Sequence, residues 1–290
     1  MKGTFISIGT VCALLLMYAL FTSGSKTPIT NQVVTQVYVP SSMTFAGESV
    51  PFDQDTKERL DRELTTNTYR HSATIRILKL SARYFPIIEE VLRANGVPDD
   101  FKYLAVAESG LENVSSPKSA KGYWQFLDST GKSYGLEISS DVEERYHIEK
   151  STLAACKYFK QAHERFGNWT MAAASYNMGM SGLSNRVSEQ NENNYYQLHL
   201  NSETARYVYR ILAFKQIMTS PSQYGFHFYH EDLYSPIATK TIAVTHIENI
   251  PRFSKEHGTT YKMIKKLNPW LKRTSLKAKT GKSYSIKVPL

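Results

Sequence analysis

The chain has 290 residues, of which 41% are hydrophobic and 21% charged, with a formal net charge of +9 at pH 7. This composition excludes a disordered chain and allows one large folded domain or two smaller ones. The net positive charge lies at the C-terminal end, because residues 238–290 contain 12 Lys+Arg and 2 Asp+Glu, whereas the rest of the chain contains 23 Lys+Arg and 24 Asp+Glu.

The N-terminus carries an apolar segment. Lys2 precedes an uncharged run from Phe5 to Phe21, and a short Thr/Ser/Gly stretch follows. This pattern is typical of a signal peptide, and the run is also close to the minimum length of a membrane-spanning helix. We interpret residues 1–24 as a signal peptide or membrane anchor that directs export and would contact the membrane. Lipidation of Cys12 is not expected, because the valine before it fits a lipoprotein cleavage site poorly.

The next segment is polar, and a helical pattern then begins. Residues 25–52 are rich in Val and Thr and contain three prolines, so we expect a tether with little core of its own. From Asp53 apolar residues recur at helical spacing, and no alternation of strands and helices is present. The fold is therefore predicted to be mainly α. Helices are expected over residues 53–64, 72–94, 150–166, 169–178 and 203–219.

Another helix is expected to begin at Pro98, because proline and the two acids after it suit a first turn. Phe101 and Leu104 start an apolar stripe whose next position, at i+7, is Glu108. This helix therefore directs a carboxylate along its inward face, near its C-terminal end. Burial and the helix dipole should both raise the pKa of Glu108, as a general acid requires. The alternative is a frayed glutamate in solvent.

Three further segments carry polar and aromatic residues. Ala120–Gln125 places Gly122 beside Tyr123 and Gln125, where glycine permits close backbone approach and aromatic rings can stack on sugars. Tyr176 and Asn177 follow an alanine-rich stretch. Each also has an ordinary structural explanation. The last segment starts the final long helix. In the ordinary structural explanation, Glu203 is a charge at the N-terminus of this helix, Ser202 is the helix cap, and Tyr207 is a core aromatic residue.

Together these segments resemble an ordered set of family motifs. Glu108-Ser109, Ala120-x-Gly122-x-Trp124-Gln125, Tyr176-Asn177 and Glu203-Thr204-x-x-Tyr207-Val208 are similar to those of the lytic transglycosylases of glycoside hydrolase family 23, especially the D-type membrane-bound lytic murein transglycosylases. The resemblance covers roughly residues 85–220. It implies a goose-lysozyme-like helical catalytic domain over residues 53–230 with a groove for glycan strands, in the periplasm or cell envelope. Ser175 and Lys121 depart from the family pattern and leave subsite preference open.

The resemblance also implies roles. Glu108 would protonate the glycosidic oxygen between N-acetylmuramic acid and N-acetylglucosamine, and would then act as base on the C6 hydroxyl, giving a 1,6-anhydro sugar. Tyr207 would hydrogen-bond near Glu108, and Glu203 would support the site. The partner would be peptidoglycan, with cell-wall synthesis or division proteins as further partners and no nucleic acid. The implied substrate-binding residues are Ser109, Gly122, Tyr123, Gln125, Tyr176, Asn177, Glu203 and Tyr207.

Two alternatives stay open. A lysozyme-type peptidoglycan hydrolase would need a second carboxylate about 5 to 10 Å from Glu108. A non-catalytic wall-binding protein would need none. No cluster of residues with metal-ligand spacing is present, so no metal or cofactor is expected. The candidates for a second carboxylate are Glu112, Asp128, Glu137 and Asp141, all in polar segments expected to be exposed.

Residues 238–290 resemble a LysM domain, a small β-α-α-β glycan binder. Strand patterns at 241–244 and 284–288 enclose two predicted helices, at 250–257 and 260–267. The usual Gly-Asp-Thr near the start is replaced by His246-Ile247-Glu248. The basic charge suits a polyanion such as a cell-wall polymer or is a solvated surface. This LysM-like module is therefore either a glycan binder or a packing domain that covers the catalytic one.

Overall fold

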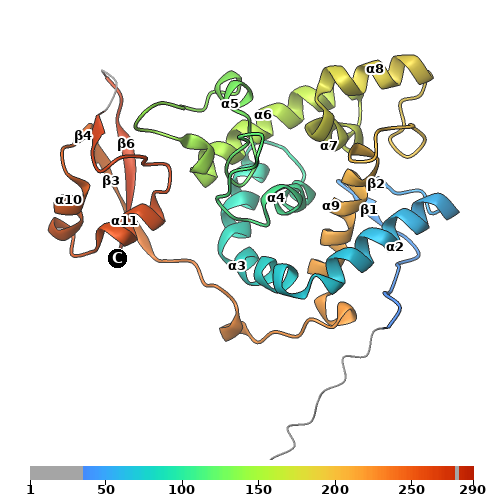
Figure 1. Cartoon of the computed structure of the whole chain (residues 1–290), viewed down its shortest axis with the longest axis horizontal. Coiled ribbons are helices and arrows are strands. Elements are labelled where there is room, and N and C mark those ends of the chain that lie inside the picture. The colour runs from blue at the N-terminus through green and yellow to red at the C-terminus, as the bar shows by residue number, and fades with distance from the viewer. Residues whose placement is uncertain (1–34, 278–280) are drawn as a thin grey trace, which may run out of the picture. The chain divides into compact units, whose positions relative to one another are not determined.

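The structure, a computed structural model, describes residues 35–277 and 281–290 (Figure 1). The predicted signal or anchor segment, residues 1–24, lies outside them. Among the described residues, no helix is both long and apolar enough to cross a membrane. The chain from Val37 onward forms one compact unit with two hydrophobic cores, one in the helical part and one in the LysM-like module.

The helical part confirms the predicted mainly α class, and most predicted helices are present within a few residues. The helices α5 and α8, which the sequence pattern did not predict, complete it. In chain order the elements are β1 (Thr44–Phe45), β2 (Glu48–Ser49), α2 (Gln54–Tyr69), α3 (His71–Ala94), η1 (Asp99–Phe101), α4 (Lys102–Ser109), α5 (Asp128–Ser133), η2 (Glu144–Tyr146), α6 (Ile148–Phe166), α7 (Trp169–Met178), α8 (Met180–Gln190), α9 (Thr204–Thr219), η3 (Pro221–Tyr224) and η4 (His230–Asp232).

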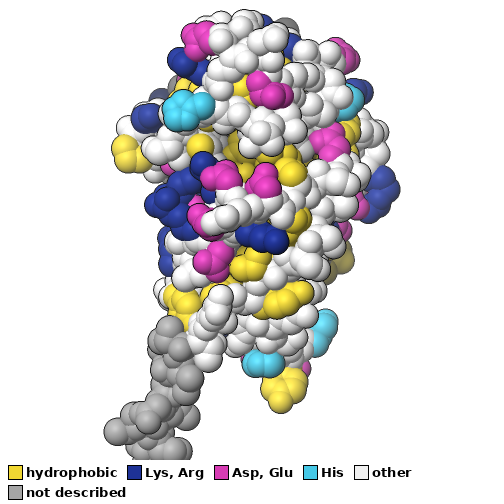
Figure 2. Space-filling model, turned by 90° about the vertical axis from the view of Figure 1, so that its right-hand side faces the viewer, with side chains coloured by type: hydrophobic (Ala, Val, Ile, Leu, Met, Phe, Trp, Pro, Cys, Tyr) yellow, Lys and Arg dark blue, Asp and Glu magenta, His cyan; other side chains and the backbone are white. Residues whose placement is uncertain are grey.

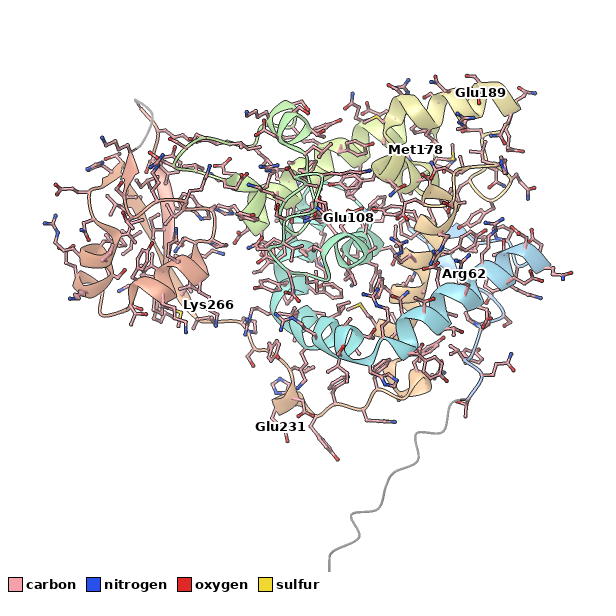
Figure 3. The ribbon with its side chains drawn as sticks, viewed as in Figure 1. Arg62, Glu108, Met178, Glu189, Glu231 and Lys266 are labelled. Carbon is pink, nitrogen blue, oxygen red and sulfur yellow. The ribbon has the colours of Figure 1, made fainter. Side chains whose placement is uncertain are left out.

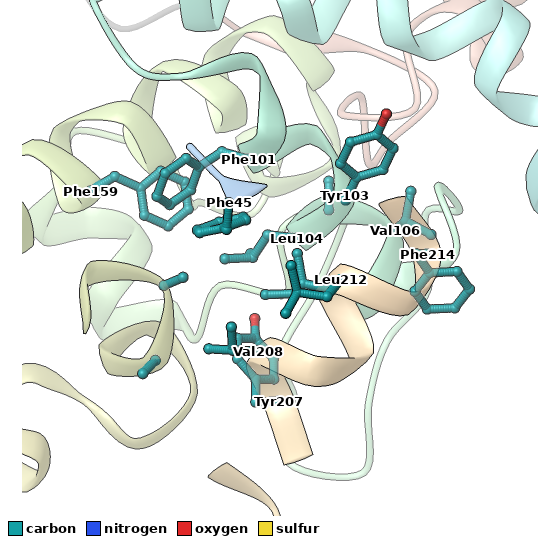
Figure 4. Close-up of a cluster of buried hydrophobic side chains, with 14 of the residues drawn as sticks. Phe45, Phe101, Tyr103, Leu104, Val106, Phe159, Tyr207, Val208, Leu212 and Phe214 are labelled. Carbon is teal, nitrogen blue, oxygen red and sulfur yellow. The ribbon is translucent and has the colours of Figure 1, made fainter. Parts of the chain in front are cut away.

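The short helix α4 lies in the middle of the helical part and packs against α3 and α9 (Figure 1). The predicted start at Pro98 is a single 3-10 turn, η1, which continues into α4. Leu104 and Val106 of α4 belong to one buried hydrophobic cluster with Val208 and Leu212 of α9 (Figure 4). Each fully buried aliphatic side chain contributes roughly 1.5 to 3 kcal/mol. This packing fixes the helix end that carries Glu108.

Residues 37–52 correct the prediction of a tether. Strands β1 and β2 form a hairpin whose Phe45 is fully buried and lies 5.3 Å, centroid to centroid, from the ring of Phe101. Glu48 accepts hydrogen bonds from the backbone N–H groups of Trp169 and Thr170 at the start of α7. A carboxylate at a helix N-terminus is stabilised by the unpaired N–H groups there. The segment is therefore part of the helical domain's core.

The LysM-like module has the predicted β-α-α-β order. Its long strands β3 (Thr239–Val244) and β6 (Tyr284–Pro289) pair antiparallel, and the helices α10 (Ile250–Glu256) and α11 (Tyr261–Leu267) lie between them in the chain. A second antiparallel pair, β4 (His246–Ile247) with β5 (Leu276–Lys277), was not predicted from the sequence. His246 and Ile247, which replace the usual glycine-containing motif, thus form a strand.

On one face of the helical part the charged side chains are of mixed sign. On the face shown in Figure 2, basic and acidic side chains lie among one another with apolar side chains between them. This agrees with the near balance of charge outside residues 238–290. A surface of mixed sign produces little long-range attraction for a polyanion, so binding there depends on local contacts.

Candidate active site

Glu108 lies in the interior of the helical part, on the last turn of α4, whereas Glu189 and Glu231 lie at its edges (Figure 3). Gly110 ends this helix in the left-handed conformation, with φ of 62°. Glu108 lines a pocket of about 690 Å³ whose walls come from the α2–α3 junction, the end of α4 and α9. The Glu108 residue as a whole is half-buried, and it lines that pocket.

The pKa of Glu108 is raised from 4.5 to about 7, chiefly because burial penalises the carboxylate. A hydrogen bond from the Tyr207 hydroxyl and the charge of Arg210 act in the opposite direction, and Glu203 raises the pKa slightly. Burial raises the pKa of Tyr207 well above its usual value, so this hydroxyl stays protonated and donates. The predicted rise in the pKa of Glu108 and its predicted contact with Tyr207 are both present.

This raised pKa makes stability depend on pH. Between the unfolded and folded pKa values, the unfolded state loses its proton first, so stability falls as pH rises from about 4.5 to about 7. We expect Glu108→Gln, which cannot ionise, to be more stable than the wild type at pH 8 by on the order of 2 kcal/mol, after allowance for partial exposure. At about pH 4.5 the two proteins should differ much less. Thermal unfolding at both pH values measures this, and an equal difference at the two would contradict it.

Three of the predicted binding residues hold one loop, residues 119–126. The Ser109 hydroxyl donates to the Tyr123 carbonyl at 2.8 Å, and the Tyr176 hydroxyl donates to the Trp124 carbonyl at 2.7 Å. Gln125 Nε2 donates to the Gly122 carbonyl at 2.7 Å. Unpaired buried carbonyls are costly, so these bonds fix the path of the loop. The structure thus brings these motif residues together around the loop that follows Glu108.

Gly122 and Tyr123 also serve this loop. A Cβ on Gly122 would lie 1.8 Å from the carbonyl oxygen of Arg145, and its φ is +81°. Glycine is therefore required by the protein backbone at this point. The Tyr123 ring packs on Tyr84 at 5.1 Å and lines a separate pocket of about 290 Å³, so its carbonyl, not its ring, reaches the Glu108 side.

The last two motifs meet at the start of α9. Asn177 Oδ1 accepts a hydrogen bond from the Thr204 hydroxyl at 2.8 Å. Glu203 is exposed and forms an ion pair with Arg210 at 3.1 Å. The expected cap, Ser202, is not the cap of this helix, because Asn201 Oδ1 accepts from the N–H groups of residues 203 and 204 instead. Asn offers the same acceptor as Ser at this position, so the sequence could not separate the two neighbours.

The pocket also contains arginines that the sequence motifs did not indicate. Arg206 and Arg210 of α9 share Glu63 of α2, a carboxylate with a side chain only 2% exposed, at 2.6 and 3.7 Å. The spacing of residues 203, 206, 207 and 210 places them on one helical face, which is a signal that could have been used. The pocket is also lined by Arg70 and Arg76. It therefore presents several cations beside Glu108, while the other two carboxylates of its lining, Glu63 and Glu112, are held in ion pairs with arginines.

The candidate second carboxylates are all held in ion pairs. Glu112 is the one of these that lines the same pocket, and Arg76 binds both of its oxygens. Asp128 pairs with Lys132 on its own helix. Glu137 and Asp141 face the LysM-like module, so the expectation that Glu137 is exposed is wrong. Among the described residues, no group of three or more potential metal ligands is present.

Comparisons with known proteins confirm the resemblance. Family models described as transglycosylase SLT domain and soluble lytic transglycosylase C-terminal LysM-like domain match residues 85–199 and 240–290. Over 244 residues the chain is 25% identical to the membrane-bound lytic murein transglycosylase D of Escherichia coli, in strains K12 and CFT073, covering 81% of this chain and 52% of the relative. The chain thus spans about half the length of the curated relatives it matches. The solved 70 kDa soluble lytic transglycosylase of Escherichia coli matches with a TM-score of 0.44 and 16% identity, over 62% of this chain and 31% of that one.

Proposed function

We propose that this chain, which carries a transglycosylase SLT domain and a C-terminal LysM-like domain and is homologous to membrane-bound lytic murein transglycosylase D, is a peptidoglycan lytic transglycosylase of the cell envelope. The observation that carries the proposal is the half-buried Glu108, whose pKa of about 7 keeps it partly protonated near neutral pH. General acids work best when their pKa lies near the working pH.

In the proposed reaction Glu108 first donates its proton to the glycosidic oxygen between N-acetylmuramic acid and N-acetylglucosamine. The resulting carboxylate then accepts the proton of the muramoyl C6 hydroxyl, whose oxygen attacks C1 to form the 1,6-anhydro ring. The bond from Tyr207 supports the first step, because it stabilises the carboxylate that remains on Glu108 after the proton is donated. The proton balance closes without water, so Glu108 ends the cycle protonated.

Substrate binding is proposed for the polar atoms that the fold leaves unused. Within the described residues, Gln125 is engaged through Nε2 and Asn177 through Oδ1. Gln125 Oε1 can accept from, and Asn177 Nδ2 can donate to, an acetamide of the sugar. Ser109, Gly122, Tyr123 and Tyr176 would act by holding the loop, as their hydrogen bonds and packing indicate. Glu203 would act through Arg210.

The arrangement favours transglycosylation over hydrolysis. Hydrolysing glycosidases use a second carboxylate as nucleophile or to activate water. In this pocket both oxygens of Glu112 are bound by Arg76. This two-bond ion pair occupies the carboxylate, so it would have to break before Glu112 could attack a sugar carbon or activate water. A single acid that serves twice therefore fits the site better.

The experiment is mass spectrometry of purified peptidoglycan digested by residues 25–290. Products that end in 1,6-anhydromuramic acid are expected. Reducing muramic acid ends would instead establish a lysozyme-type hydrolase. Binding to peptidoglycan without release of any soluble product would favour the wall-binding alternative.

A further inference from the structure

A residue of the helical part enters the hydrophobic core of the LysM-like module. Val142, which precedes η2, is 1% exposed and packs within the module's core. It forms a β-bridge with Leu271, and its neighbour Glu143 donates its backbone N–H to the Trp270 carbonyl at 2.9 Å. Lys272 donates its N–H to the carbonyl of Asp141, also at 2.9 Å. Main-chain pairing and the burial of Val142 in the module's core indicate a fixed contact, not a flexible tether.

Ion pairs surround this contact. We call residues 137–149 the docking segment. Its Glu137, with a side chain only 7% exposed, pairs with Lys282 and accepts a hydrogen bond from the Tyr284 hydroxyl at 3.0 Å. Its Glu149 pairs with Lys287 of β6. Part of the module's basic charge is thus neutralised within the chain, and removing one partner would leave the other charge poorly solvated.

The docking segment also holds the 119–126 loop. Glu143 and Arg145, with side chains 2% and 4% exposed, form a two-bond ion pair at 2.7 and 2.8 Å. Arg145 Nη1 then donates to the carbonyls of Ser119 at 3.2 Å and Phe126 at 3.1 Å, at the two ends of the loop. The Arg145 carbonyl packs on Gly122 so closely that no side chain fits between them. A buried arginine with all these partners has little freedom to move.

The loop in turn lies beside Glu108. Its Tyr123 carbonyl is bound by Ser109, the residue that follows Glu108 on α4. Its Trp124 carbonyl is bound by Tyr176. A displacement of about 1 Å at a substrate-orienting group can cost about 10²-fold in rate. The position of the loop therefore matters for any reaction at Glu108.

We propose that the LysM-like module is a positioning element of the active site. By docking on residues 137–149 it fixes the buried Glu143–Arg145 pair, and this pair fixes the 119–126 loop, with Gln125, against the helix that carries Glu108. Glu143 and Arg145 are positioning residues in this scheme. The module then raises turnover on every substrate, including one too short to reach it. The effect on turnover rests on the proposed function, whereas the effect on the loop does not.

The test reverses charges on the module alone. Lys282→Glu/Lys287→Glu places acids against Glu137 and Glu149, and Glu137→Lys/Glu149→Lys added to it restores opposite charges. Lys255→Glu on α10, an exposed lysine outside the described ion pairs, makes the same kind of charge change away from the interface. A fourth variant, Leu271→Asp, puts a charge into the centre of the contact. Hydrogen exchange of residues 139–143 reports docking, and exchange of 119–126 reports the loop.

The charge-reversed variant and Leu271→Asp should both speed hydrogen exchange in residues 139–143 and 119–126. The turnover substrate is a soluble tetrasaccharide of alternating N-acetylglucosamine and N-acetylmuramic acid. On it, both variants should lower kcat by about 10- to 10²-fold with little change in KM. The four-residue charge swap should recover both, and Lys255→Glu should resemble the wild type. Faster exchange in 139–143 with an unchanged 119–126 loop would overturn the proposal. So would unchanged exchange of 139–143 in both variants. A protein inactive on every glycan would reject the proposed function, while the exchange data would still decide the coupling.

Discussion

Glu108→Gln is expected to lower the release of soluble muropeptides by about 10² to 10⁴-fold, the range that general acid–base catalysis contributes. Glutamine keeps the size of the side chain and can still accept the hydrogen bond from Tyr207, so the α4–α9 contact should survive. What it lacks is the proton that the acid donates and the carboxylate that later accepts one. Initial rates of release of 1,6-anhydro products from purified peptidoglycan measure the loss. Release at the wild-type rate would rule out Glu108 as the acid.

Tyr207→Phe is the companion variant, because it keeps the carboxyl and removes only the hydrogen bond. That bond lowers the pKa of Glu108, so its loss should raise the pKa above about 7. An acid with a higher pKa stays protonated to higher pH. The ratio of kcat/KM in the variant to that in the wild type should therefore increase from pH 6 to pH 8.5, even if kcat falls. A constant ratio would show that Tyr207 does not set this pKa.

The helices of this fold were predictable because local signals agree with tertiary packing. The stripe of Phe101 and Leu104 is buried as its spacing indicated, and Gly167 ends α6 in the left-handed conformation. The sequence pattern did not reveal the role of residues 37–52, because it depends on separate buried residues, Val37, Phe45 and Val50, which fill a core formed by distant parts of the chain. The average hydrophobicity of a stretch of sequence does not reveal a single buried residue of this kind. The hairpin is visible only when its partner Phe101 is known.

The candidate site was predictable to a different degree. The sequence placed Glu108 on an inward face and implied its contact with Tyr207, and both are present. It could not show that Ser109 and Tyr176 bind loop carbonyls, since side-chain direction depends on long-range packing. Nor could it show that Glu137 pairs with Lys282, because ion pairs across 145 residues leave no local pattern. From the sequence alone, the basic C-terminal charge therefore indicates only an outside partner or a solvated surface.

Gly122→Ala should be among the most damaging single changes in the chain. The added Cβ would lie 1.8 Å from the Arg145 carbonyl oxygen and 2.6 Å from its carbon. Both atoms belong to the backbone of the docking segment, which is held in place, so neither the 119–126 loop nor the docking segment can move aside without a large loss of stability. We expect a loss of about 4 kcal/mol or more, which corresponds to a fall in Tm of about 8 to 16 °C for a protein of this size.

Gly167→Ala separates this steric effect from backbone strain. Gly167 has φ of +79°, nearly that of Gly122, but apart from its own chain neighbours no part of the protein lies within 4 Å of the position that its Cβ would take. It should cost only the strain of a left-handed alanine, about 1 to 2 kcal/mol. Thermal unfolding of the two variants side by side gives the difference, and equal losses would show that Arg145 does not press on the loop. Because Gly122 lies in the loop that carries Gln125, the folded fraction of Gly122→Ala should also turn over more slowly, whereas Gly167→Ala should not.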